Sequence, residues 1–189
     1  MNNKKILLSA FILIALIQLF VPVKMIWDRE KVIDSGTVFR FMTAPVDPND
    51  PFRGKYITLN YRENTFRVED TNDWTRGEYI YVYFSESEDG FAQIQSVSKT
   101  PFTDESDFIL TKVQYVSKDS SNTIVVEFPF DRFYMEESKA YDAEHVYRQS
   151  QIDTTSLTYA LVSIKDGEAV LQDVLIDEIP IKELVEKDN

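Results

Sequence analysis

The sequence contains no cysteine and a single histidine, and both shortages narrow the chemistry that it can perform. Without cysteine there is no disulfide, no thiolate ligand for a metal and no thiol nucleophile. The lone histidine, His145, would have to serve any Ser-His-Asp triad, yet no G-x-S-x-G nucleophile motif accompanies it. Motifs typical of zinc proteases, P-loops and dinucleotide sites are also missing. We therefore expect no metal centre and no cofactor.

Basic residues are scarce as well. The chain has 20 lysines and arginines against 32 aspartates and glutamates, which gives a net charge of −12. Residues 1–26 hold three lysines and no acid, so the rest of the chain carries −15. Nucleic acids and anionic lipids are bound through basic patches, which such a chain does not offer. Nucleic acid is therefore excluded as a partner.

Charged side chains are absent from one long stretch near the N-terminus, Ile6–Val23. As a helix these residues span about 27 Å, close to the roughly 30 Å hydrocarbon core of a bilayer. The exit from this stretch, LFVPVKMIW, is bulky where a cleavable signal peptide has small residues. We expect residues 1–26 to be an uncleaved signal anchor that crosses the membrane once. Lys4 and Lys5 favour a cytoplasmic N-terminus, which places the following domain on the other side.

Glycine is rare too, and the first of the five glycines, Gly36, ends a segment without helix breakers. We expect residues 27–36 to be a helical linker that continues the membrane helix and ends at a glycine cap. The pattern then changes to period two, as in TVFRFMT (37–43) and EYIYVYFS (78–85), which indicates β-strands. The second of these strands is apolar on both faces, so we place it centrally in a sheet.

The continuing period-two pattern predicts a mainly β domain over residues 37–180. We expect a β-rich sandwich or barrel-like fold with one short helix at 138–151, beside the N-terminal transmembrane helix. Turn signals separate the strands, the last of them KDG at 165–167. The acidic residues 181–189 are expected to be a C-terminal tail.

Proline is concentrated in one place: three of the seven prolines lie in PVDPNDPFRG, residues 45–54. Proline fixes its own φ and keeps the preceding residue out of the α region, so this segment should be a rigid extended turn. It leads into the alternating run KYITLNY, which places Ile57, Leu59 and Tyr61 on one face. The rigidity serves either the fold or the presentation of this segment to a partner, and both interpretations stay open here.

The stretch PVDPNDPFRGKYITLNY resembles the signature of the GDYXXLXY family of bacterial membrane-anchored proteins. Four residues match the consensus of that family: Gly54, Tyr56, Leu59 and Tyr61. The later segment YALVSIKDGEAVLQDVLID is similar to members of that family as well. Lys55 stands where the consensus has aspartate, so no role of that aspartate in metal binding or as a base can be transferred. The resemblance implies a single-pass protein of the bacterial cytoplasmic membrane with a periplasmic or extracellular domain.

The resemblance also implies a function, although no activity is established for the family. Its members look like companions of multi-spanning membrane proteins, so we expect a non-enzymatic accessory domain that binds such a partner. The residues expected to contribute are those of the turn and the motif: Pro45, Asp47, Pro48, Arg53, Gly54, Tyr56, Leu59 and Tyr61.

The alternative is an envelope hydrolase, or a glycan- or cation-binding protein, that uses acidic residues. Asp131, Glu136 and Glu137 lie close together in sequence before the expected helix. Two carboxylates can perform acid–base work on a glycan or hold Ca²⁺. EF-hand spacing is missing, however, and acidic neighbours arise by chance in so acidic a chain.

Two ten-residue segments echo each other. PFRGKYITLN (51–60) and PFDRFYMEES (129–138) share Pro-Phe and a tyrosine at the same offset, a weak indication of a duplicated β unit. The chain's ten tyrosines exceed what one small core buries with every hydroxyl paired, so some should reach a surface.

Overall fold

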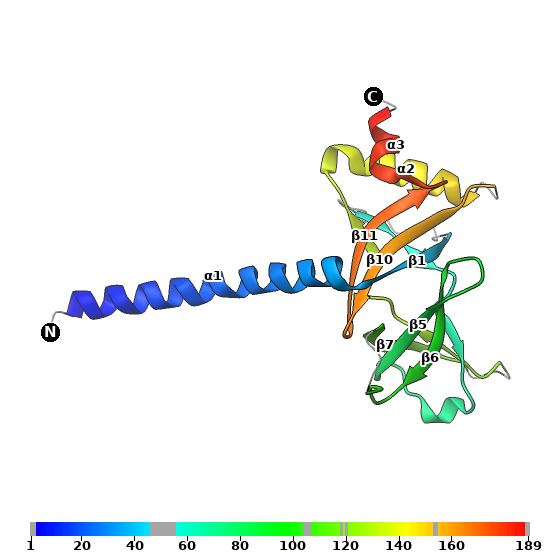
Figure 1. Cartoon of the computed structure of the whole chain (residues 1–189), viewed down its shortest axis with the longest axis horizontal. Helices are drawn as coiled ribbons and strands as arrows, with labels where there is room; N and C mark the ends of the chain where they lie inside the picture. The colour runs from blue at the N-terminus through cyan, green and yellow to red at the C-terminus, as the bar shows by residue number, and fades with distance from the viewer. Residues whose placement is uncertain are drawn as a thin grey trace.

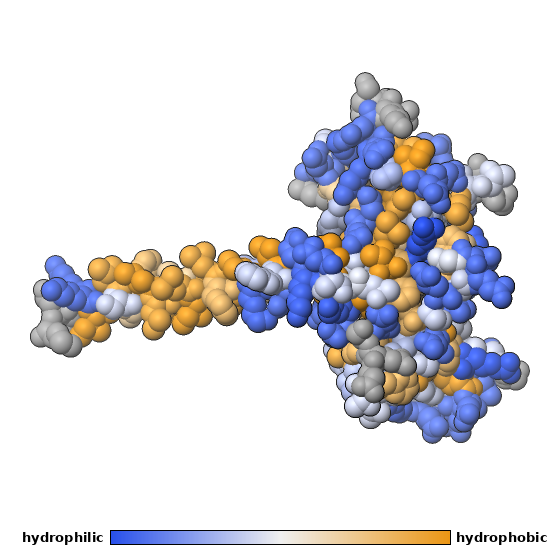
Figure 2. All heavy atoms as spheres, viewed as in Figure 1, coloured by the Kyte–Doolittle hydropathy of each residue, from blue (hydrophilic) through white to orange (hydrophobic). Residues whose placement is uncertain are grey.

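The chain folds into a long helix and one β-rich domain. The computed structural model describes residues 3–45, 56–103, 107–117, 119, 121–152 and 155–187. Helix α1 (Asn3–Ser35) leaves the domain as an isolated rod (Figure 1). Its apolar run is exposed and is long and apolar enough to cross a membrane, and Figure 2 shows it as an orange band with polar residues at the domain end. Helix α1 continues through the segment expected to be a helical linker, residues 27–36, and ends at Ser35.

The first sheet contains the strand that directly follows α1. Its strands, in sheet order, are β12 (Ile179–Pro180), β11 (Glu168–Ile176), β10 (Thr158–Lys165), β1 (Thr37–Ala44) and β3 (Asn60–Tyr61). All neighbours pair antiparallel. Along β1 the predicted alternation is confirmed: Phe39 and Phe41 are buried while Val38 and Arg40 are exposed.

The second sheet is nearly closed into a barrel. Its strands, in order, are β4 (Thr65–Arg67), β8 (Thr123–Val126), β7 (Phe108–Val116), β5 (Tyr79–Glu86) and β6 (Ala92–Ser98). The terminal strands β4 and β6 approach each other, and a 3-10 helix η1 (Thr71–Asp73) lies between β4 and β5. The prediction that residues 78–85 form a central strand is confirmed, because β5 has a neighbour on each side.

A short two-stranded sheet and two helices complete the domain. Strands β2 (Tyr56–Thr58) and β9 (Arg132–Tyr134) pair antiparallel. Helix α2 (Glu137–Ile152) follows β9 and confirms the helix expected at 138–151. It buries Ala143 and Tyr147, and it packs against α3 (Ile181–Lys187) at one end of the first sheet (Figure 1).

The C-terminal segment requires a correction. Residues 181–189 were expected to be an acidic tail, but residues 181–187 form the second helix of the domain, α3. Ile181 and Val185 are fully buried, and Leu184 packs against the same core. These positions form one apolar helical stripe, while acidic residues between them face solvent and dominate the composition.

Aromatic side chains join the sheets into one core. Phe41 of β1 lies 5.0 Å from Phe130, 5.2 Å from Phe84 and 5.7 Å from Tyr61 between ring centroids. Burying each such ring stabilises the fold by about 2–3 kcal/mol, and edge-to-face contacts add to this. The mainly β, barrel-like fold class expected from the sequence is confirmed.

Gly36 lies where α1 turns directly into β1. Its amide donates to the carbonyl of Val32 at 2.9 Å, which ends the helix as expected of a cap. Its φ is not positive, however, so left-handed geometry is not the reason for glycine. A Cβ at this position would lie 2.4 Å from the carbonyl oxygen of Val32 and 2.9 Å from that of Ile164. Close backbone approach is what requires glycine here.

We expect Gly36→Ala to lower the free energy of unfolding by about 2 kcal/mol or more, because backbone atoms must move to admit the methyl group. Thermal and urea unfolding of the detergent-solubilised full chain measures this. Gly90→Asn is the control, since Gly90 has open space and a positive φ that asparagine tolerates. Equal effects of the two substitutions would contradict the steric explanation.

Candidate functional site around the motif strand

The alternating motif strand divides its residues between the surface and the core. Ile57 and Leu59 are each 1% exposed, whereas Tyr56 is half-buried. Tyr56 pairs directly with Tyr134 across the β2–β9 ladder, so the two tyrosines of the sequence echo face each other. The amide of Leu59 continues the contact by donating to the carbonyl of Asp131 at 2.8 Å.

Tyr61 anchors the end of the motif in the aromatic core. Its hydroxyl donates to the carbonyl of Phe130 at 2.8 Å. Burial raises the pKa of Tyr61 well above its ordinary value, and Tyr147 and Asp131 add to the rise. The hydroxyl therefore stays protonated and acts as a structural donor. Leu59 and Tyr61 thus serve the fold, although both were expected among the interaction residues.

Three side chains form the exposed part of the motif region, which we call the Tyr-Arg-Tyr stack: Tyr56, Arg132 and Tyr134. The ring centroids of Tyr56 and Tyr134 lie 5.4 Å apart, and the Arg132 guanidinium carbon lies 5.1 Å from the Tyr56 centroid. Tyr134 is 62% exposed. Hydrogen bonding to Tyr134 raises the pKa of Arg132, with Asp131 contributing next. The stack holds a cation and two rings in one orientation at the surface.

Most of the remaining residues of the predicted turn lie outside the described part of the chain. Pro45 follows β1 and is exposed. Asp47, Pro48, Arg53 and Gly54 lie outside the described residues. The structure therefore brings Tyr56, Leu59 and Tyr61 together, two in the core and one at the surface.

The alternative acidic site is spread along the chain. Asp131 precedes β9, Glu136 follows it, and Glu137 begins α2. Glu136 and Glu137 are neighbours in the chain, whereas β9 separates both of them from Asp131. The Oδ1 atom of Asp131 lies instead 3.9 Å from the Nε atom of Arg132. Within the described part of the chain, no three acidic or histidine side chains come close enough to hold a metal ion. An acid-based activity stays a prediction without support from this geometry.

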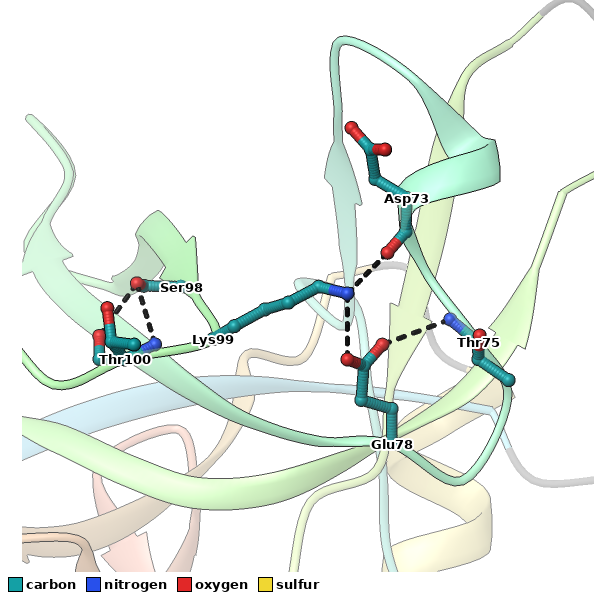
Figure 3. Close-up of polar contacts among 6 residues, drawn as sticks. All are labelled: Asp73, Thr75, Glu78, Ser98, Lys99 and Thr100. Atoms are coloured by element: carbon teal, nitrogen blue, oxygen red, sulfur yellow. Dashed lines mark hydrogen bonds and ion pairs between the residues drawn. The ribbon is translucent and has the colours of Figure 1, made fainter.

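A polar cluster centred on Lys99 lies elsewhere and contains no motif residue. Lys99, which follows β6, donates to a Glu78 carboxylate oxygen at 2.7 Å and to the carbonyl of Asp73 (Figure 3). The other Glu78 oxygen accepts from the amide of Thr75 at 3.1 Å. Lys99 also lies over the Trp74 ring, 5.4 Å from its centroid. These contacts fasten the η1 turn to the end of β6.

Arg132 and Tyr134 were not among the site residues predicted from the sequence. Neither belongs to the motif stretch, and Tyr134 lies 78 positions after its strand partner Tyr56. The echo between the two Pro-Phe segments was the only signal that linked them.

In a comparison with known families, the family model described as "GDYXXLXY protein" matches residues 18–174, from within the apolar run of α1 into β11. Comparison with curated proteins and with solved structures gives no match.

We expect Tyr61→Phe to lower the free energy of unfolding by about 1 kcal/mol, because the carbonyl of Phe130 loses its buried donor. Tyr147→Phe is the matched control. Burial raises the pKa of Tyr147 to about 12, against a smaller lowering by nearby Thr43, and its hydroxyl has no partner within hydrogen-bond geometry among the described residues. Removing that hydroxyl should leave stability unchanged or raise it. Urea unfolding tests both variants, and the reverse order of stabilities would contradict the assignment.

The Lys99 cluster predicts a dependence of stability on pH. The hydrogen bond from Lys99 lowers the pKa of Glu78 below its ordinary value of 4.5. A carboxylate with a lowered pKa stabilises the fold above the pKa of the unfolded chain, and this stabilisation is lost as pH falls through the folded value. Lys99→Met should therefore flatten the fall in unfolding free energy below pH 4.5. Lys112→Met, which removes a lysine stacked on Tyr79, should leave that slope intact.

Proposed function

The chain belongs to the GDYXXLXY family, and from this premise we propose that it is a non-enzymatic accessory domain, held at a membrane, that binds a multi-spanning membrane protein. The single helix that can cross a bilayer among the described residues, α1, supports the anchor. The lysines at positions 4 and 5 favour an N-terminus in the cytoplasm, so the domain would lie outside the bacterial cytoplasmic membrane, in the periplasm or the extracellular space.

The Tyr-Arg-Tyr stack is the observation that carries the proposal. Tyrosine and arginine are the residues most often found as energetic anchors of protein interfaces, because they bury a large planar area at a small cost in conformational entropy. Arg132 is already oriented by Tyr56 and by Asp131, so little freedom remains to be lost on binding. The core below the stack, through Ile57 and Leu59, holds β2 in place.

The acidic surface of the domain fits such a partner as well. With a net charge of −15 beyond residue 26, the domain is repelled by anionic headgroups rather than spread on the bilayer. A protein partner in the same membrane can offer basic loops instead, and two-dimensional confinement raises the effective concentration of both proteins.

We expect a photoreactive amino acid at Tyr134 to cross-link one dominant multi-spanning protein in membranes of the native host. The same residue at Tyr115 is the control, because Tyr115 is 53% exposed on β7, outside the stack. Arg132→Gln should reduce the adduct from position 134 about tenfold or more, as loss of a central interface arginine does. Adducts of equal yield from both positions, or none from position 134 in a folded protein, would refute the stack as the contact surface.

A further inference from the structure

A groove lies between the end of α1 and the turn that joins β10 to β11. Its volume is about 350 Å³, and the charged side chains that line it are balanced, with three cations and three anions: Arg29, Lys31, Lys165, Asp28, Asp166 and Glu168. Met25 and Val32 give it an apolar wall. Its walls come from the one place where the domain meets the anchor (Figure 1).

The position of the groove relative to a bilayer follows from the axial rise of helix α1. The uncharged run of α1 ends at Val23, and Met25 and Asp28 lie about 3 and 8 Å further along the axis. The headgroup region on each side of a bilayer is about 5–8 Å thick. A bilayer that covers the apolar run therefore places Met25 and Asp28, at the membrane end of the groove, among the lipid headgroups. Lys31 lies about 12 Å beyond Val23, and a lysine side chain reaches a lipid phosphate from there by directing its ammonium group back toward the membrane.

Four of the six charged side chains make ion pairs or hydrogen bonds within the protein. Arg29 donates to the carbonyl of Ala169 at 2.9 Å and approaches Glu168 at 4.0 Å. Lys165 donates to Ser35, and Asp28 pairs with Lys24.

The other two charged side chains have no such partner among the described residues. Lys31 and Asp166 make no ion pair and no side-chain hydrogen bond within the described ranges, although they line the same groove. One unpaired cation and one unpaired anion thus face a common space.

We propose that this groove binds the headgroup of phosphatidylethanolamine, with Lys31 contacting the phosphate and Asp166 the primary ammonium group. A zwitterionic headgroup satisfies both charges at once, whereas an anionic lipid leaves Asp166 unpaired beside a domain of net charge −15. A quaternary ammonium cannot donate a hydrogen bond to Asp166, so phosphatidylcholine fits less well. The proposal rests on α1 lying in a bilayer, as the proposed function requires, but not on any protein partner.

Native mass spectrometry of the full-length protein tests the site. The protein is exchanged into detergent that contains equal amounts of palmitoyl-oleoyl phosphatidylethanolamine, phosphatidylglycerol and phosphatidylcholine, and the lipid retained on the folded protein is identified. We expect phosphatidylethanolamine to be retained about fivefold more than either competitor, as the use of one additional charged contact predicts. Lys31→Gln combined with Asp166→Asn should abolish this preference.

Arg76→Gln combined with Asp89→Asn is the control, because it removes the same two charges from exposed turns of the second sheet. Equal retention of the three lipids, a preference for phosphatidylglycerol, or a preference that survives the groove variant would overturn the proposal. Carbonate extraction of cell membranes, made in parallel, reports separately whether the chain is membrane-inserted, so a failed anchor is distinguished from a failed lipid site.

Discussion

The turn between β10 and β11 is the contact on which the arrangement of the molecule depends. Gly167 at its tip hydrogen-bonds in both directions to β7, its amide to Phe108 at 3.1 Å and its carbonyl from Leu110 at 3.0 Å. It needs a φ of +91°, and a Cβ there would meet the Phe108 ring at 3.2 Å. The strands that flank this tip belong to the first sheet, so one glycine joins that sheet to the barrel-like second sheet.

The same turn also receives the anchor. Lys165 on one side of it contacts Ser35, the last residue of α1, and Arg29 reaches the carbonyl of Ala169 on the other side. Thr37 at the start of β1 then donates to Asp107 just before β7 at 2.8 Å. Because helix, hairpin and barrel meet within a few residues, the domain is held in one orientation to its anchor rather than tethered by a flexible linker. The groove at this junction and the Tyr-Arg-Tyr stack consequently have defined positions relative to α1.

Much of this architecture was readable from the sequence, and the failures have physical causes. Local periodicity identified α1, the central strand β5 and helix α2, because each depends on residues close in the chain. Helix α3 was missed since its apolar stripe of three positions is diluted by acids. Gly36 was predicted correctly as a helix end, but its steric need for glycine could not be predicted, because the carbonyl of Ile164 that crowds it comes from a distant strand.

The candidate site was predictable only in part for the same reason. The alternating motif segment predicted that Ile57, Leu59 and Tyr61 share one face, yet the exposed half of the stack comes from β9, far away in sequence. Pairing between β2 and β9 decides that Tyr134 and Arg132 lie against Tyr56, and no local pattern encodes such a long-range register. The contact of Gly167 with β7 was likewise invisible in a segment that reads as an ordinary hairpin turn.

A distance measured across the junction shows whether α1 and the domain form one rigid unit. The chain has no cysteine, so cysteines introduced at Trp27 and Tyr115, both exposed, can be spin-labelled without background. Double electron–electron resonance in nanodiscs should give one narrow distance distribution. A broad or multimodal distribution from folded protein would show that the domain swings on its anchor and would contradict the account.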